Sequence, residues 1–121
     1  MKNVMLIAAA ATLLSCGTAF GQYTGSRSGP CPGTLTLTWA GATPSVSQVL
    51  LFANSPGAFV IPPGITCSST VLGLSGSGLQ IVVRIPTGPG FGSISGSAGP
   101  AVCAGKFQWI EVPSCNTSNV F

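Results

Sequence analysis

The sequence predicts an all-β protein: a small antiparallel β-sandwich of seven to eight short strands with two disulfides. Seventeen glycines and ten prolines are spread along the 121 residues, so the segments between them are short. Those segments either alternate apolar and polar residues or are continuously apolar, as strands are. Five cysteines are present, and four of them follow the N-terminal segment, which is the number that two disulfides need.

Residues 1–21 are typical of a signal peptide. Lys2 supplies a positive charge near the start, and residues 4–14 form an apolar run that is too short to span a bilayer. Residues 19–21, Ala-Phe-Gly, form a plausible cleavage site that would leave Gln22 as the first residue. We therefore expect a secreted or envelope-associated protein.

An alternative processing route is open at Cys16. Residues 13–17, Leu-Leu-Ser-Cys-Gly, resemble a lipobox, in which Cys16 would be lipidated and would anchor the protein. Ordinary cleavage fits better, because residues 15–21 form a region of normal length before the cleavage site. A membrane is thus an expected partner only if Cys16 is lipidated.

The domain is expected to follow a leader. Residues 22–32 are rich in glycine and serine and are expected to be a flexible leader, whereas residues 33–121 are expected to form the sandwich. Residues 34–39 alternate perfectly, with leucines and a tryptophan on one face. Further strands are expected at residues 49–53, 59–61, 70–72, 79–85, 91–98, 106–112 and 117–121. No segment of the domain shows the 3.6-residue period of a helix, and strands at this spacing favour an immunoglobulin-like arrangement.

Two strands carry specific expectations for their side chains. In residues 79–85, alternation predicts that the apolar members point inward: Leu79, Ile81, Val83 and Ile85. In residues 106–112, apolar residues occur in both phases of the strand, which suggests a β-bulge. A bulge would also be needed to bring Lys106 beside Glu111, five residues later.

The spacing of the cysteines restricts their pairing. Cys103 and Cys115 flank one strand, and the twelve steps between them span more than ~30 Å when extended. The Cα atoms of a disulfide lie within about 7 Å, so this pairing is disfavoured. If successive strands alternate in direction, Cys31 and Cys103 fall at one end of the domain, and Cys67 and Cys115 at the other. We predict the disulfides Cys31–Cys103 and Cys67–Cys115.

The composition provides few residues of the types used in catalysis and metal binding. The chain has four Lys or Arg residues, one acidic residue, Glu111, and no histidine. General acid–base catalysis and most zinc and calcium sites use Asp, Glu and His, so we expect no enzyme, no cofactor and no metal site. The net charge of +3 is too small and too scattered for nucleic-acid binding. Glu111 itself is expected to be solvated or paired with a nearby base.

The sequence is compatible with two modes of binding, one to a ligand and one to other chains or a surface. Trp109 is a candidate for an aromatic patch that would bind a carbohydrate or another ligand, although most aromatic residues fit the inward pattern of their strands. Residues 116–118, Asn-Thr-Ser, also match an N-glycosylation acceptor. The alternative is association, because few charged residues are available to protect exposed strand edges. The expected partners are then further copies of the chain or a cell-surface polymer.

Four short motifs carry a resemblance to known proteins: CPGTLTL at residues 31–37, GATP at 41–44, PGAFVIP at 56–62 and CNTSNV at 115–120. With these motifs the chain resembles a family of cysteine-framed, immunoglobulin-like β-sandwich modules of secreted bacterial proteins, often C-terminal. Such modules usually have a turn rich in Asp and Asn between two late strands, where this chain has PTGPG at residues 86–90. The resemblance implies an extracellular accessory or surface role and supplies no catalytic residues. We therefore expect a structural or adhesive accessory protein; the alternative is a ligand-binding module that uses Trp109.

Overall fold

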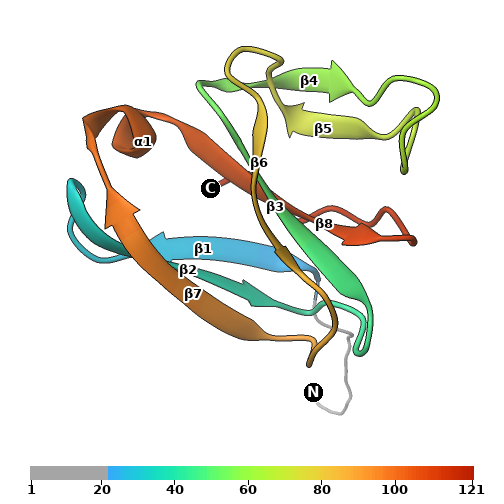
Figure 1. Ribbon diagram of the computed structural model, residues 1–121, viewed down its shortest axis with the longest axis horizontal. Helices are drawn as coiled ribbons and strands as arrows, with labels where there is room; N and C mark the ends of the chain where they lie inside the picture. Colours follow the sequence, from blue (N-terminus) through green and yellow to red (C-terminus); the bar gives the residue numbers. More distant parts are fainter. Residues whose placement is uncertain (1–21) are drawn as a thin grey trace, which may run out of the picture.

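The computed structural model describes residues 22–121. The expected signal peptide, its cleavage site and Cys16 lie outside the described residues. The described chain forms eight antiparallel strands and one short helix, and the strands make three separate sheets (Figure 1). Within residues 22–121, no helix has the length and apolar character needed to cross a membrane.

The three sheets contain three, three and two strands. The first has the order β1 (Thr24–Ser28), β2 (Gly33–Ala40) and β7 (Gly92–Ala98). The second has the order β6 (Gln80–Ile85), β3 (Ser47–Ala53) and β8 (Lys106–Val112). The third pairs β4 (Pro56–Val60) with β5 (Val71–Leu74). The all-β prediction, with eight short strands and two disulfides, is confirmed, while the immunoglobulin-like sandwich topology stays a prediction.

The central β6-β3-β8 sheet separates two core clusters. The first cluster lies toward the β1-β2-β7 sheet and includes Leu50 and Phe52 of β3. The second lies toward the β4-β5 sheet and includes Val49, Leu51 and Ala53 of the same strand. Successive residues of β3 therefore enter opposite clusters, as the two-residue period of a strand requires. Burial on both faces explains why residues 49–53 are apolar throughout.

The apolar residues of β8 follow the same rule, so the bulge expected in this strand is absent. Phe107 and Trp109 enter the first cluster and Ile110 enters the second. Every residue from Lys106 to Val112 pairs in unbroken register with β3. Lys106 therefore pairs with Ala53 at one end of the strand and Glu111 with Gln48 near the other, and the two charged residues do not meet.

A bulge occurs in β6 instead. Leu50 pairs with Val83 and Leu51 with Ile81, so Val82 is the extra residue. The extra residue changes the phase of the strand, and the prediction that all four apolar residues of residues 79–85 point into one core is wrong. Val83 and Ile85 pack on the first cluster and Leu79 on the second, whereas Ile81 is 49% exposed and Val82 47%.

Strand β1 lies within the segment that was expected to be a flexible leader. Residues 24–28 pair antiparallel with residues 36–40 of β2. The composition of this segment reflects close packing, because a Cβ atom on Gly25 would overlap the rings of Phe121 and Trp109. A larger residue at this position would push the strand away from the core.

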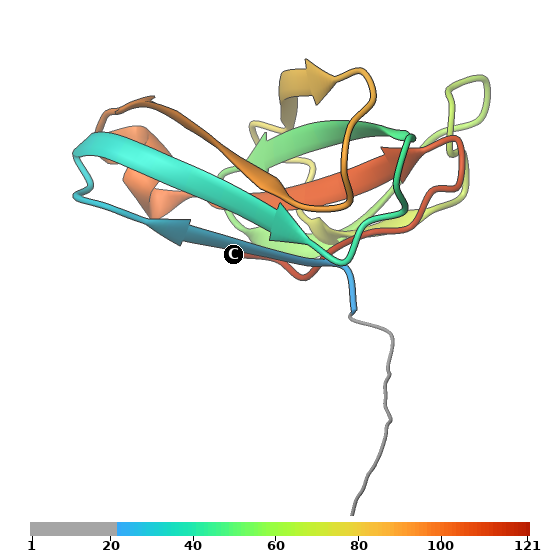
Figure 2. The same cartoon turned by 90° about the horizontal axis from the view of Figure 1, so that it is seen from below.

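The C-terminal segment runs along β8 and then lies beside β1 (Figures 1 and 2). Thr117 forms an isolated bridge to Ile110, and the backbone of Phe121 exchanges two hydrogen bonds with that of Phe107. The strand expected at residues 117–121 is thus present only as an irregular partner of β8. The helix α1 (Pro100–Ala104) was not expected, because five residues are too few to show a helical period.

Both predicted disulfides are confirmed. Cys31–Cys103 joins the β1–β2 connection to α1, with the Cα atoms 5.7 Å apart. Cys67–Cys115 joins the β4–β5 connection to the segment after β8, with the Cα atoms 5.5 Å apart. One disulfide therefore lies before β8 and the other after it, so β8 keeps the two disulfides apart. Two disulfides are typical of proteins in an oxidising environment, such as the extracellular space.

We expect either disulfide to contribute about 4 kcal/mol to the free energy of unfolding in the chain-entropy account. The sequence separations are 72 and 48 residues, and the entropy depends only on their logarithm. The double variants Cys31→Ser/Cys103→Ser and Cys67→Ser/Cys115→Ser should therefore lose nearly equal stability in urea unfolding. A difference well above ~1 kcal/mol between them would show that loop closure is not the main cause.

Candidate functional site

The carboxylate of Glu111 is the most polar group in the interior of the described chain. Its residue is 1% exposed, contrary to the expectation of a solvated side chain. Its Oε2 accepts a hydrogen bond from the backbone N of Thr43 at 2.6 Å. Its Oε1 accepts from Thr43 Oγ1 at 3.1 Å, Ser114 Oγ at 2.7 Å and Asn116 Nδ2 at 3.2 Å. One carboxylate thus joins the β2–β3 connection to the segment that follows β8.

These donors determine the protonation state of Glu111. Burial alone would raise its pKa, because a charged group is less favourable away from water. The hydrogen bonds from Thr43, Ser114 and Asn116 stabilise the anion and outweigh burial, so the pKa of Glu111 lies below its ordinary value. A general acid or base must exchange a proton with a substrate near the working pH. Glu111 is instead an ionised acceptor whose two oxygens are both engaged.

Tyr23 lies in the same polar region, at the start of the described chain. Its hydroxyl donates to Gln48 Oε1 at 2.8 Å, and Gln48 is itself buried. Burial, and then the negative charge of Glu111, raise the pKa of Tyr23 well above its usual range. The phenol therefore stays neutral and acts as a hydrogen-bond donor.

A polar cleft of about 990 Å³ lies over these groups. It is lined in part by Gln22, Tyr23, Gly41, Thr43, Glu111 and Asn116. One wall is made by Asn119, whose side-chain amide bonds to both the N and the O of Gly25, at 2.8 and 3.0 Å. The side chain of Asn119 therefore makes the two hydrogen bonds with Gly25 that the backbone of a neighbouring strand would make. Several of the hydrogen-bonding groups in the lining, among them Tyr23, Glu111 and Asn119, already have partners.

Trp109 lies in the core and not in an exposed aromatic patch. Its side chain is 0% exposed, and its ring centroid lies 5.0 Å from that of Trp39. Its Nε1 donates to the backbone O of Thr38 at 3.2 Å. This side chain therefore exposes no surface that a ligand could contact. Phe91, before β7, is in contrast 67% exposed.

The remaining polar candidates are also engaged within the fold. Cys31, Cys67, Cys103 and Cys115 are all in disulfides. Among residues 22–121, no group of three or more His, Cys, Asp or Glu side chains is placed to hold a metal ion. Asn116, which matches the N-glycosylation motif, is exposed and donates a hydrogen bond from its amide nitrogen to Glu111.

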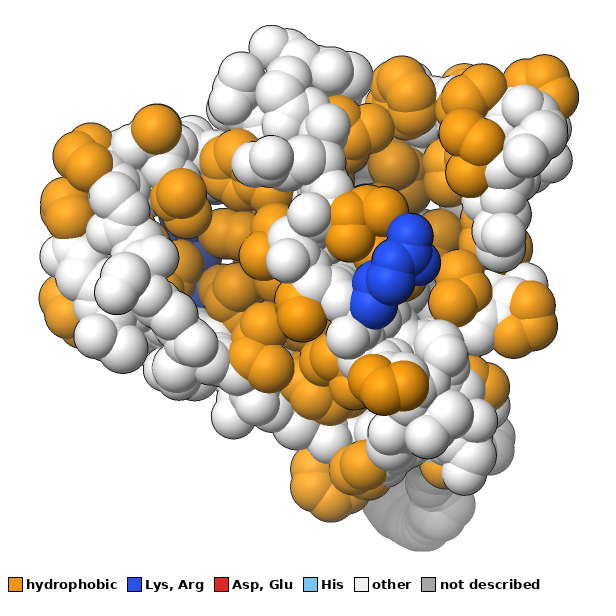
Figure 3. Space-filling model, viewed as in Figure 1, with side chains coloured by type: hydrophobic (Ala, Val, Ile, Leu, Met, Phe, Trp, Pro, Cys, Tyr) orange, Lys and Arg blue, Asp and Glu red, His pale blue; other side chains and the backbone are white. Residues whose placement is uncertain are grey.

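Two apolar grooves flank β6, and the sequence did not reveal them. The β6–β7 groove has a volume of about 570 Å³ and is lined in part by Leu35, Phe52, Val83, Ile94, Val102 and Phe107. The second groove, of about 500 Å³, lies between β6 and the β4–β5 connection, and its lining includes Val49, Phe59, Ile65, Ile81, Arg84 and Val112. Figure 3 shows apolar side chains gathered on this face of the molecule, with a hollow between β6 and β7. The surface around β6 is thus mainly apolar.

Comparisons with protein-family models, with curated proteins and with solved structures found no match to this chain. No family is therefore identified for the resemblance that the four short motifs carry. The function is therefore inferred from the residues of this chain alone.

We expect Glu111 to make the protein acid-sensitive. Because its pKa is lower in the folded chain than the ordinary value of about 4.3, the ionised group stabilises the fold above that pH. This stabilisation is lost as the pH falls through the folded pKa. Glu111→Gln should lower the free energy of unfolding at neutral pH by roughly 2 kcal/mol and flatten its decline in acid.

Urea unfolding over a series of acid pH values measures this effect. The chain has no second acidic side chain and no histidine, so few other side chains titrate in this range. Ser114→Ala, which removes one of the donors, should lower stability and reduce the acid decline without abolishing it. An equal acid decline in the parent and in Glu111→Gln would contradict the assignment.

We expect Tyr23 to resist ionisation until the protein unfolds. It is the only tyrosine in the chain, so the phenolate absorbance reports on this group alone. A raised folded pKa means that the neutral phenol stabilises the fold below the unfolded value of about 10, and that this contribution falls as the pH rises above it. Phenolate absorbance should therefore appear together with the loss of the circular dichroism signal. Ionisation near the ordinary pKa in folded protein would disprove this environment.

Proposed function

We propose that this chain is a secreted or envelope-associated accessory protein, immunoglobulin-like in topology, with a structural or adhesive role and no catalysis. It acts by association through the surface around β6. The single observation that carries the proposal is that β6 combines a free edge, exposed apolar side chains and an apolar groove on each side. Its expected partners are other copies of the chain or a polymer of the cell surface.

The side chains of β6 support association. Ile81 and Val82 are about half exposed, and Arg84 is the one charged residue of this strand. Natural proteins usually protect edge strands with charges, and contiguous exposed apolar surface marks an interaction site. The bulge at Val82 interrupts the regular edge, so burial of side chains contributes more here than continuous backbone pairing.

The use of Glu111 supports a role without catalysis. It is the only acidic side chain of the protein, and both of its oxygens accept hydrogen bonds that join two parts of the fold. An ionised carboxylate in this setting stabilises structure, and its lowered pKa makes it a weak general base. The disulfides add stability in an oxidising compartment, which suits a small protein with few charges.

Charged substitutions on β6 test the proposal. We expect the parent protein to self-associate with increasing concentration in sedimentation velocity, or to bind purified envelope material. Ile81→Lys/Val82→Lys should weaken that association on the order of tenfold or more, because each lysine must be desolvated in the contact. The matched control Ser26→Lys/Ser28→Lys adds the same charge on exposed positions of β1 and should change nothing.

Two results would overturn the proposal. One is a parent protein that stays monomeric at high concentration and also fails to bind envelope material. The other is association that the substitutions on β6 and those on β1 weaken equally, because this would reflect net charge rather than the surface around β6.

A further inference from the structure

The β6–β7 groove opens directly onto the first core cluster. Strands β6 and β7 belong to different sheets, and within residues 22–121 neither has a strand partner on its outer edge (Figure 1). The groove between them is lined by Leu35, Phe52 and Phe107, which are core residues. The interior of the protein is therefore accessible from this side, as the hollow in Figure 3 shows.

Gly96 marks unfilled space within this groove. It pairs with Leu35 of β2, so it lies on the inward face of β7, between Ile94 and Ala98. A Cβ atom on Gly96 would have no other atom within 4 Å. Gly96 is exposed, so this space is an open part of the groove that a side chain of a bound partner can occupy.

The outer edge of β7 is suited to backbone pairing. The strand keeps unbroken register with β2 from Gly92 to Ala98, and it contains only glycine, serine, alanine and one isoleucine. No charge, proline or bulge protects this edge. An extended peptide can add to such an edge as a further strand, with alternate side chains directed into the groove.

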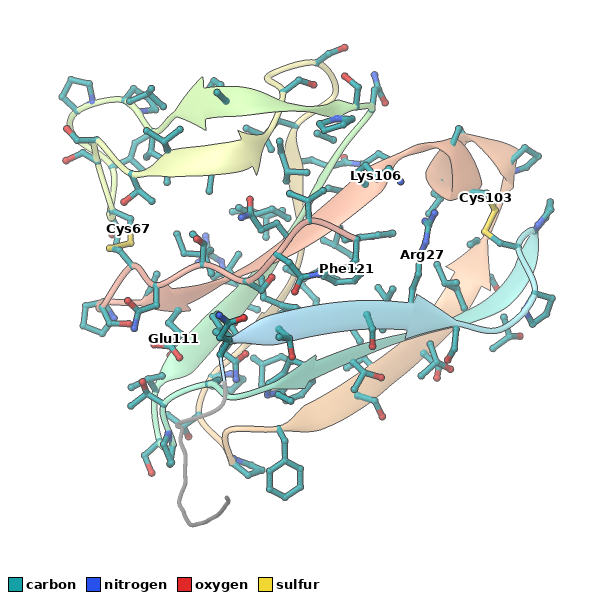
Figure 4. All side chains as sticks on the ribbon, turned by 180° about the vertical axis from the view of Figure 1, so that it is seen from behind. Arg27, Cys67, Cys103, Lys106, Glu111 and Phe121 are labelled. Atoms are coloured by element: carbon teal, nitrogen blue, oxygen red, sulfur yellow. A yellow bond between two sulfur atoms is a disulfide. The ribbon has the colours of Figure 1, made fainter. Side chains whose placement is uncertain are left out.

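Arg27 does not line the groove, but it places a positive charge near the Val102 end of the groove. Its Nη2 donates to the backbone O of Cys103 at 3.4 Å, and its Nη1 is buried without a hydrogen-bond partner. Cys103 follows Val102, which lines the groove; Figure 4 shows Arg27 beside Cys103, and basic atoms are visible deep in the hollow of Figure 3. Arg27 as a whole is half-buried, and a buried charged nitrogen such as its Nη1 is costly unless it is hydrogen-bonded or paired with an anion.

The chain itself offers no acidic side chain for this arginine. Its only one, Glu111, is bound to Thr43, Ser114 and Asn116 near the opposite end of β8, far from Arg27 (Figure 4). A second copy of the chain lacks a free acidic side chain for the same reason. An acidic side chain that pairs with Arg27 would therefore come from a different protein.

We propose that the β6–β7 groove binds an extended peptide segment of another protein, which pairs with β7, places an apolar side chain against Gly96 and directs a carboxylate toward Arg27. This inference rests on the proposed association role and names the chemistry of a partner. The occupant is an apolar strand with one acidic residue.

Fluorescence anisotropy with two synthetic peptides tests the inference. Both alternate threonine and valine; one carries a glutamate near one end and the other a glutamine at that position. We expect the purified, disulfide-bonded protein to bind the glutamate peptide on the order of tenfold more tightly than the glutamine peptide. Hydrogen exchange of residues 93–97 should slow when the glutamate peptide is bound.

Three variants identify the groove. Gly96→Leu should fill the space, weaken binding of both peptides at least tenfold and leave the melting temperature equal or higher. Arg27→Gln should remove the preference for the glutamate peptide. Arg84→Gln is the matched control, because it removes the same charge from β6 at a position that lines the second groove, and it should change neither binding nor preference.

Several outcomes would overturn the inference: no saturable binding of either peptide at millimolar concentration, equal binding of the two by the parent, or unchanged binding by Gly96→Leu. Loss of self-association in Gly96→Leu without peptide binding by the parent would assign the groove to a second copy instead. If Gly96→Leu fails to fold, Arg27→Gln and Arg84→Gln with the two peptides decide. Failure here, with association still sensitive to Ile81→Lys/Val82→Lys, leaves the proposed function standing.

Discussion

The structure depends on one constraint, the burial of β3 on both faces. Because neighbouring side chains of a strand point to opposite sides, Leu50 and Leu51 must enter two separate clusters. Each cluster then needs its own covering sheet, β1-β2-β7 on one side and β4-β5 on the other. A chain of this length has few strands to share between two clusters. The coverage is therefore thin, and it is least complete beside β6, where both grooves lie.

The two ends of β8 compensate for this thin coverage. The segment before β8 is bonded to the β1–β2 connection by Cys31–Cys103, and the segment after it to the β4–β5 connection by Cys67–Cys115. Glu111 adds a third link, to the β2–β3 connection. These three links lie at the two ends of β8. Covalent and polar contacts therefore stabilise connections between strands that the apolar clusters do not hold together.

The sequence predicted features that follow from strict alternation and failed where local geometry breaks it. The inward leucines of β2 and the cysteine pairing followed from strand period and strand direction. Val82 was missed because a bulge depends on the partner strand, and nothing in its own neighbourhood indicates one. β1 was missed because Gly25 is required for close approach to Phe121, a contact 96 residues away in sequence. For the site, the sequence singled out Glu111 but not its donors Thr43 and Ser114, which the fold brings to the carboxylate.

The small number of charges connects the buried carboxylate with the unpaired arginine. In a chain with more charged residues of both signs, Arg27 and Glu111 could each pair with an opposite charge nearby. Here the one acid is held by neutral donors near one end of β8, and the guanidinium near the other end has a single hydrogen bond, to a backbone oxygen. Neutral donors satisfy an anion well, because each adds a directed N–H or O–H, whereas a carbonyl satisfies only part of a guanidinium. The Glu111 carboxylate therefore has its donors within the described chain, whereas one nitrogen of Arg27, Nη1, is buried without a hydrogen-bond partner.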